Sequence, residues 1–434
     1  PPKQSAGQVA ARLEQAERRA GRPTVVTPTD ANADVHGGRW TGGEVDMPAV
    51  PYDAGASPPP APGDLVEFRQ TDIDSGNGSM INEPSVASNG PTMLVTWNWY
   101  AAVSTDGGAT FSFINPSTAF PFADGGFCCD QVAYYIPSRD LFVWVLQYSP
   151  DSNENNRLRL AYAHGAAEVA AGTWSYWDFT PQGHGAANGT NFDQPKLAFT
   201  ADKFFISVTR YGATGGSIVI RMDLDDLAAG GSSIATEWTA PGLFSPGLAV
   251  SANPGSTMYY AAHVDTDTIR VFTWPDSVGF GGITTHNINH TAYATNYPMQ
   301  CPRTGGSATS DWCQRRSFGG GWAHTDRIFT GWLVGNELAF GWDSTQGNSG
   351  FGQRDYPWVF MVFIDPTTYT LTSQKTFSNS NYAFSYLSVH PNAQGDLGAS
   401  FMYGGGTIYQ TCGGAVRDAI TPTWDYIGFV ASNM

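Results

Sequence analysis

The chain has 434 residues, of which 14% are charged, and its formal net charge at pH 7 is -16. This acidity excludes a protein built to coat nucleic acid or an anionic membrane, because both partners require a basic surface. No run of eighteen apolar residues occurs, so we expect no membrane span. The 50 glycines, 28 prolines and 25 phenylalanines favour strands and tight turns, and the composition predicts an all-β fold.

The first sixty residues differ in character from the rest. Residues 5–20 carry the one convincing helical pattern, and Pro/Gly-rich segments follow it. We therefore predict an N-terminal arm with a short helix and a linker over residues 1–60, and a β-propeller over residues 61–434. The chain opens on Pro1 without an apolar leader, which leads us to expect a mature, secreted form.

From about residue 64, short apolar and aromatic runs recur at a period of roughly fifty to sixty residues. Each copy has a short strand, a turn with Asn, Asp, Pro or Gly, and a second, more apolar strand. This pattern predicts a single propeller with six blades, although five or seven blades stay open because residues 336–380 contain further strand-like text. The copies begin at Glu83, Asp130, Asp193, Ser245, Ser317 and Phe384.

A turn in the first copy carries a resemblance to a known family. Ser104, Asp106, Gly108, Thr110 and Phe111 match the Ser-x-Asp-x-Gly-x-Thr-Phe pattern of the Asp-box, and we expect this turn to join the third and fourth strands of a blade. In this respect the chain resembles the sialidase-like Asp-box propellers. That resemblance implies a propeller fold and a choice among glycoside hydrolases, some lyases, and non-catalytic receptor or scaffold proteins.

The resemblance does not extend to sialidases proper. Their first catalytic arginine stands in a Phe-Arg-Ile-Pro-type motif, and the nearest text here, Phe68-Arg69-Gln70-Thr71, lacks the Ile-Pro.

Propeller geometry predicts where a site lies. Inner strands start, and second strands end, at the same end of every blade, which we call the mouth end; loops on a rigid scaffold surround a central pocket there. Carboxylates and amides at this end suit sugar hydroxyls. The inner strands start at Glu83, Asp130–Gln131 and Asp193–Gln194, and the second strands end on Asn98, Gln147, Arg210, His263 and Tyr403.

The first hypothesis is a carbohydrate-active enzyme, most simply a glycoside hydrolase. Glu83, Asp130 and Asp193 would supply the acid and the nucleophile or base, although Asp130 and Asp193 could equally cap nearby backbone. Since the sequence gives no distance between carboxyl groups, retention and inversion stay open. The substrate-binding candidates are Asn98, Gln131, Gln147, Gln194, Arg210, Trp312, Arg315 and Arg316.

Two other functions stay open. A lyase acting on a uronic-acid polymer would use His263 or Tyr403 as the base and Arg210 on the substrate carboxylate. A non-catalytic glycan-binding or adhesion propeller would use the same groups only to hold a ligand.

Five cysteines leave at least one unpaired within the chain. Cys301 and Cys313 bracket a loop of plausible disulfide size that carries Trp312, Arg315 and Arg316. These two arginines could hold an acidic sugar or phosphate, or pair with acidic loops of the protein. Cys128 and Cys129 could bond to each other or to different partners.

No cofactor motif stands out. The segment 72–83 has acidic residues at three EF-hand positions but lacks the other ligand and the glycine, so we expect no metal in a catalytic role and allow only a structural calcium ion. The expected partner is a polysaccharide or glycan, and the expected state is a monomer.

Overall fold

The computed structural model describes residues 35–40, 44–46, 84–230, 236–240, 244–295, 299, 301, 327–405, 408–419 and 424–429. They belong to two compact units, the first within Gln70–Ser245 and the second within Val26–Arg69 and Pro246–Met434. Among the helices of these ranges, none has the length and apolar character needed to cross a membrane.

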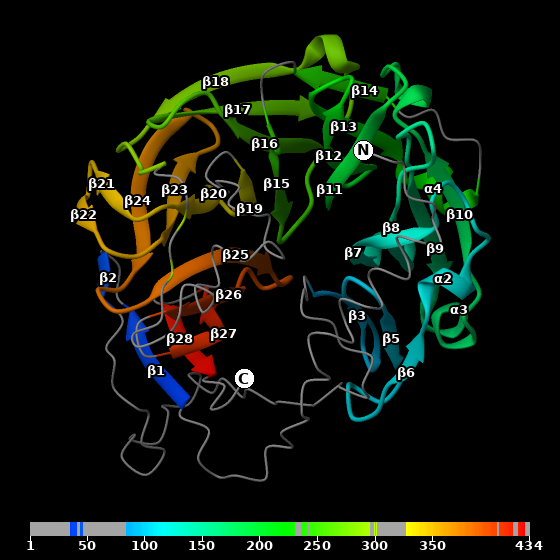
Figure 1. The fold of residues 1–434 in the computed structure, drawn as a ribbon, viewed down its shortest axis with the longest axis horizontal. Helices are drawn as coiled ribbons and strands as arrows, with labels where there is room; N and C mark the ends of the chain where they lie inside the picture. The colour runs from blue at the N-terminus through cyan, green and yellow to red at the C-terminus, as the bar shows by residue number, and fades with distance from the viewer. Residues whose placement is uncertain are drawn as a thin grey trace. The chain divides into compact units, whose positions relative to one another are not determined.

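The first unit contains three four-stranded antiparallel sheets, each a meander of consecutive strands (Figure 1). A four-stranded meander of this kind is the blade of a β-propeller. The sheets comprise β3 (Ser85–Asn89), β4 (Thr92–Thr96), β5 (Ala101–Ser104) and β6 (Ser112–Ile114); β7 (Phe127–Ile136), β8 (Leu141–Tyr148), β9 (Leu158–His164) and β10 (Ser175–Phe179); and β11 (Thr190–Phe199), β12 (Lys203–Gly212), β13 (Gly216–Asp223) and β14 (Thr236–Ala240).

The second unit repeats this plan with three further meanders. Its first two meanders join through parallel pairing of their inner strands, β15 and β19. The strands are β15 (Gly247–Ser251), β16 (Thr257–His263), β17 (Thr268–Pro275) and β18 (Thr284–Asn289); β19 (Ile328–Val334), β20 (Glu337–Ser344), β23 (Trp358–Asp365) and β24 (Thr370–Ser378); β25 (Ala383–Pro391), β26 (Leu397–Gly405), β27 (Ile408–Arg417) and β28 (Trp424–Phe429); and the hairpin β21 (Gly347–Ser349) and β22 (Gly352–Arg354).

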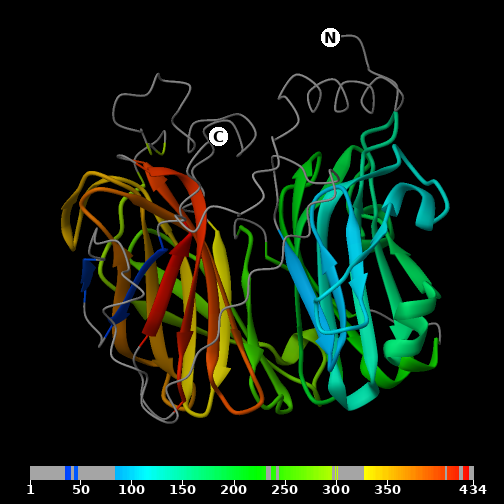
Figure 2. The ribbon, with the colours of Figure 1, turned by 90° about the horizontal axis from the view of Figure 1, so that it is seen from below.

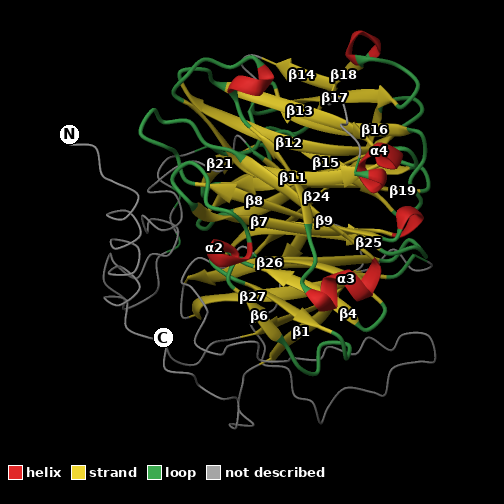
Figure 3. Cartoon of the chain, turned by 90° about the vertical axis from the view of Figure 1, so that its right-hand side faces the viewer, coloured by secondary structure: helices red, strands yellow, loops and turns green. Residues whose placement is uncertain are grey.

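Short helices occupy connections between strands (Figure 3). They are α2 (Pro116–Ala119), α3 (Gly165–Ala171) and α4 (Leu224–Ala229). The prediction of an all-β fold with propeller blades is confirmed.

Two strands come from the segment predicted as an N-terminal arm. β1 (Val35–Trp40) pairs antiparallel with β28, and β2 (Glu44–Asp46) pairs parallel with β24. Part of the predicted arm therefore extends the sheets of the second unit, while the boundary near residue 60 stays a prediction. The helix predicted over residues 5–20 lies outside the described residues.

Burial along each sheet explains why the sequence forms these strands. All eight residues of β8, the second strand of its sheet, which contains the apolar run Leu-Phe-Val-Trp-Val-Leu, are buried, because both faces of an interior strand of a blade are covered. The outermost strand β10, with the sequence Ser-Tyr-Trp-Asp-Phe, is largely exposed. Trp144 of β8 is fully buried in the core of the first unit, and truncating such a side chain to Ala costs roughly 3–5 kcal/mol.

The turn that matches the Asp-box pattern joins β5 to β6, the third and fourth strands, as predicted. The Asp106 carboxylate accepts hydrogen bonds from the Thr110 hydroxyl at 2.6 Å and the Thr110 backbone N–H at 2.9 Å. Gly108, at φ 87°, donates its N–H to the Ser104 hydroxyl. The bonds from Thr110 lower the pKa of Asp106 to about 2. This turn is a structural element.

Five of the six predicted copies match an inner strand and a second strand of one sheet. The copy that begins at Ser317 is wrong by one strand. Its predicted second strand is the inner strand β19, and the true second strand is β20, in the stretch Glu337–Ser344.

Candidate functional site

The inner strands are bulged close to where they start. Register shifts interrupt the pairing of β7 with β8, of β11 with β12 and of β25 with β26. At these places Asp130, Gln194 and Tyr386 have φ of 21°, 56° and 57°. Positive φ in non-glycine residues and bulges both concentrate at functional sites, where they re-aim side chains. In Figure 2 the strands of each unit run up and down the page, so one end of each sheet lies at the top and the other end at the bottom.

In the first unit, one hydrogen bond links two neighbouring sheets at the mouth end. The Gln147 side-chain amide, near the end of β8, donates to Asp193 Oδ1 on the inner strand β11 at 3.1 Å. The same carboxylate oxygen accepts the backbone N–H of Gln194 at 3.0 Å. Asp193 is partly exposed and lies beside the bulge of β11. The structure therefore brings together two predicted site residues from different sheets.

Asp130 lies in the bulge of β7, and β7 packs against β11. Directly before it, Cys128 and Cys129 form a disulfide bond with each other. Cys129 stands opposite Gln147 in the pairing of β7 with β8. The predicted carboxylates Asp130 and Asp193 thus belong to adjacent inner strands at the same end of the first unit.

Gln131 has a structural environment. Its side-chain amide donates to the backbone carbonyls of Trp97 and Tyr100, and its Oε1 accepts the indole N–H of Trp144 at 2.8 Å. These bonds tie β7 to the turn after β4, which carries Asn98. Since both ends of the Gln131 amide are used within the protein, we do not include it among ligand contacts.

Several buried acceptors at this end have no hydrogen-bond partner among the described residues. They are Asn98 Oδ1, Gln147 Oε1 and Gln194 Oε1. Asn98 is 3% exposed and Gln147 is 7% exposed. A buried acceptor without a donor costs roughly 1–3 kcal/mol, so these oxygens are suited to a donor from outside the protein.

Arg210 is placed near the end of β12, opposite Phe192. The side chain is buried, and Nη2 donates to the carbonyl of Gly215 at 3.3 Å. Arg210 therefore lies near the end of a second strand and has a partner in the next loop.

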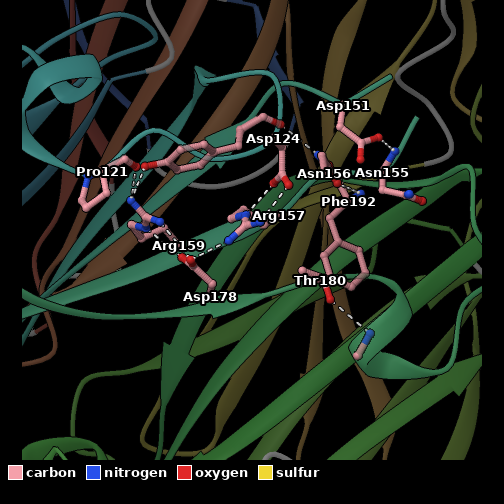
Figure 4. A network of polar contacts seen from close by, with 12 residues as sticks. Pro121, Asp124, Asp151, Asn155, Asn156, Arg157, Arg159, Asp178, Thr180 and Phe192 are labelled. Atoms are coloured by element: carbon pink, nitrogen blue, oxygen red, sulfur yellow. Dashed lines mark hydrogen bonds and ion pairs between the residues drawn. The ribbon is translucent and has the colours of Figure 1, made fainter. Parts of the chain in front are cut away.

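An ion-pair network, which the sequence interpretation missed, supports the same end of the second sheet (Figure 4). The buried Arg159 forms two parallel bonds to Asp178, at 2.7 and 2.9 Å, and donates to the Tyr148 hydroxyl at 2.7 Å. Arg157 binds Asp178 at 2.8 Å and also binds Asp124. Tyr148 directly follows Gln147, so this network fixes the strand that carries the site glutamine.

In the second unit, the residue at the position equivalent to Gln147 is Asp343, near the end of β20. Asp343 is fully buried and accepts hydrogen bonds from the Ser385 hydroxyl and from the Tyr386 backbone N–H at 3.1 Å. Burial raises the pKa of Asp343 to about 7. The sequence signal was the Asp that closes the run Glu-Leu-Ala-Phe-Gly-Trp-Asp, which the misaligned fifth copy concealed.

The two residues proposed as a lyase base also lie in the second unit. His263, the last residue of β16, has both ring nitrogens buried, and its ring lies 4.8 Å from that of Trp342, centroid to centroid. Burial lowers the pKa of His263 to about 3. Tyr403 is 4% exposed, and burial raises its pKa.

The remaining predicted residues, Glu83, Trp312, Arg315 and Arg316, lie outside the described residues, as does Cys313. Cys301 is disulfide-bonded, and Cys412 is a free thiol. Within the described ranges, no group of three or more His, Cys, Asp or Glu side chains is placed to hold a metal ion.

No model of a known protein family matches the chain, and no curated protein matches it in sequence. Several solved structures are similar to the chain at low TM-scores. A GH93 α-L-arabinofuranosidase of Fusarium graminearum has 11% identity and a TM-score of 0.40, with 81% of this chain and 92% of that chain covered. An α-L-arabinanase of Penicillium chrysogenum has 11% identity and a TM-score of 0.40, with 83% and 94% covered.

The Trypanosoma rangeli sialidase has 12% identity and a TM-score of 0.37, with 80% of this chain and 54% of that chain covered. At these identities and TM-scores the similarity assigns no function to the chain.

Proposed function

We propose that the protein is a secreted glycoside hydrolase that acts on a polysaccharide or glycan through carboxyl groups at the mouth end of the first unit. The observation that carries this proposal is the placement of Asp130 and Asp193 on adjacent inner strands, with Asp193 held by the Gln147 amide at 3.1 Å. Two carboxyl groups flanking one bond are the machinery of most glycoside hydrolases.

The environments of the two carboxylates differ. Asp193 Oδ1 accepts two N–H groups, which fix its orientation and suit it to the nucleophile or base. Asp130 lies in a bulge beside the Cys128–Cys129 disulfide and is the candidate acid. Glu83 stays a candidate for either role on sequence grounds. The buried amide oxygens of Asn98 and Gln147 would accept hydrogen bonds donated by substrate hydroxyls.

Disulfide bonding supports secretion. Cys128 and Cys129 are joined, and Cys301 is also disulfide-bonded. Such bonds persist in oxidising compartments and are rare in the reducing cytosol.

The lyase is a weaker alternative on this geometry. A pKa of about 3 makes His263 a poor proton acceptor near neutral pH, and the Tyr403 hydroxyl is buried with a raised pKa. A purely glycan-binding protein is the main competitor, because the unpartnered acceptors would serve binding as well as catalysis.

The test is product release from a panel of neutral and acidic polysaccharides, followed by assays for reducing ends and for ultraviolet absorbance. New reducing ends without absorbance support a hydrolase. Absorbance near 235 nm from an unsaturated uronide would show a lyase and overturn the proposal. Binding without any product would leave a glycan-binding protein in its place.

A further inference from the structure

We infer that the mouth end of the first unit selects a neutral glycan, bound through sugar hydroxyls that donate hydrogen bonds to the protein, and does not select a uronic-acid chain. This inference rests on the proposed carbohydrate function and names the substrate class. Its basis is the balance of donors and acceptors at this end.

Three buried amide oxygens at this end are acceptors without a donor among the described residues. Asn98 Oδ1, Gln147 Oε1 and Gln194 Oε1 are buried and accept nothing from the described residues. Asn98 and Gln147 are each more than nine-tenths buried. A ligand that satisfies amide oxygens must bring N–H or O–H donors. Neutral sugars supply hydroxyl donors at almost every ring carbon.

These acceptors belong to one end of three neighbouring sheets. Gln131 bonds the turn that carries Asn98 and stands opposite Leu146, the residue before Gln147. Gln147 in turn bonds Asp193, and Gln194 follows it in the chain. One ligand chain lying along this end would meet the acceptors in succession.

Among the described residues, three arginines near this end have protein partners. Arg157 and Arg159 bind Asp124 and Asp178 (Figure 4). Arg210 donates to a backbone carbonyl, at 3.3 Å. A uronate needs a cation or several donors for its carboxylate.

The carboxylates at this end also disfavour a uronic-acid chain. Asp193 already accepts two N–H groups, and Asp130 lies on the adjacent inner strand. Negative side chains repel a polyuronate. The described residues at this end therefore favour a neutral chain.

The experiment is calorimetric titration of the full chain with paired probes in EDTA. Oligosaccharides of galactose, glucose, xylose and arabinose are compared with oligogalacturonides and oligoglucuronides of equal length. We expect at least one neutral probe to bind at least tenfold more tightly than any oligouronide. Tighter binding of an oligouronide, or no binding by any neutral probe, would overturn the inference.

Two variants of one residue locate the contact. Asn98→Asp keeps an acceptor and should bind the neutral probe within about threefold of wild type, whereas Asn98→Leu removes it and should bind roughly tenfold more weakly. Gln394→Leu, an exposed amide in the turn between β25 and β26, is the control for the change of residue type. Equal affinity of a folded Asn98→Leu and wild type would contradict the contact.

A titration with CaCl2 alone separates a cation site from a sugar site. Calcium binding that disappears in Asn98→Leu would assign the acceptors to a metal ion and overturn the inference. Because binding is measured independently of turnover, neutral-glycan binding without hydrolysis would uphold this inference while refuting the proposed enzyme. Hydrolysis of a polyuronate would support the proposed enzyme and refute the inference of a neutral glycan.

Discussion

The Gln147 side-chain amide donates a 3.1 Å hydrogen bond to the Asp193 carboxylate, which lies 46 residues further along the chain and in the next sheet. This contact connects a residue near the end of a second strand to the bulge of the neighbouring inner strand. A hydrogen bond of this kind orients the carboxylate relative to a substrate at the mouth end.

Replacing Gln147 with Leu removes that orientation. Because a hydrogen bond to a charged group contributes roughly 1.5–3 kcal/mol, we expect kcat to fall by about 10- to 100-fold, measured by reducing-end release under saturating substrate. Gln394→Leu is the matched control and should leave kcat unchanged. A raised KM with an unaltered kcat would assign Gln147 to ligand binding alone.

The buried Asp343 carboxyl predicts a pH-dependent stability. Its pKa rises from 3.8 in the unfolded chain to about 7 in the folded protein, chiefly through burial. The folded state therefore holds the proton between these values, and the contribution of Asp343 to stability is greatest below about pH 4 and is lost as pH rises to 7. Three pKa units correspond to a loss of up to about 4 kcal/mol.

Asp343→Asn imitates the protonated form and should flatten this dependence. Urea unfolding at pH 4.5, 6 and 8 checks it. The variant should match wild type at pH 4.5 and exceed it at pH 8, and parallel curves for the two proteins would show that Asp343 does not titrate in this range.

The disulfide between Cys128 and Cys129 predicts a functional effect with little global loss of stability. A ring closed between adjacent residues constrains the unfolded chain weakly, by about 1 kcal/mol in the loop-entropy description. The bond does constrain the bulge that carries Asp130. The double variant Cys128→Ser/Cys129→Ser should thus lower kcat several-fold while its thermal midpoint changes little.

The free thiol of Cys412 provides the control for that variant. Cys412→Ser should keep full activity. If the double serine variant also keeps full activity, the disulfide has no positioning role at this site.

Replacing the buried Arg159 should lower the free energy of unfolding. It binds Asp178 through two bonds and lies over the Tyr176 ring, 4.1 Å from the centroid. Arg159→Ala leaves the partly exposed Asp178 with Arg157 alone and removes the hydrogen bond to Tyr148, and the free energy of unfolding should fall by about 1–3 kcal/mol. Arg159→Lys keeps the charge but loses the paired geometry and should lie between the two. Chemical denaturation of wild type, Arg159→Ala and Arg159→Lys measures this order. Equal denaturation midpoints would refute a structural role for the network.

Much of the fold could be predicted because its signals are local. The alternation of turn residues with apolar runs predicted the inner and second strands of five blades. The Ser104–Phe111 segment forms the predicted turn between a third and a fourth strand. The fifth copy failed because the inner strand β19 is as apolar as a second strand, so periodicity alone could not tell them apart. That shift concealed Asp343.

The site was less accessible from the sequence because its contacts are non-local. Gln131 looked like a ligand residue, yet it bonds the Trp97 and Tyr100 carbonyls, more than thirty residues earlier. The ion pairs of Arg157 and Arg159 with Asp178 likewise join residues that are 21 and 19 positions apart in the chain. The sequence shows that these polar residues are present, but their hydrogen-bond and ion-pair partners become apparent only in the folded structure.

The measurement that tests the central claim most directly is the comparison of turnover and binding in Asp193→Asn. If Asp193 is part of the catalytic pair, kcat on a neutral glycan should fall by about 10³-fold while the Kd for an oligosaccharide stays within a few-fold of wild type. An Asp193→Asn protein that turns over substrate at the wild-type rate, or that loses binding without losing kcat, would contradict the assignment.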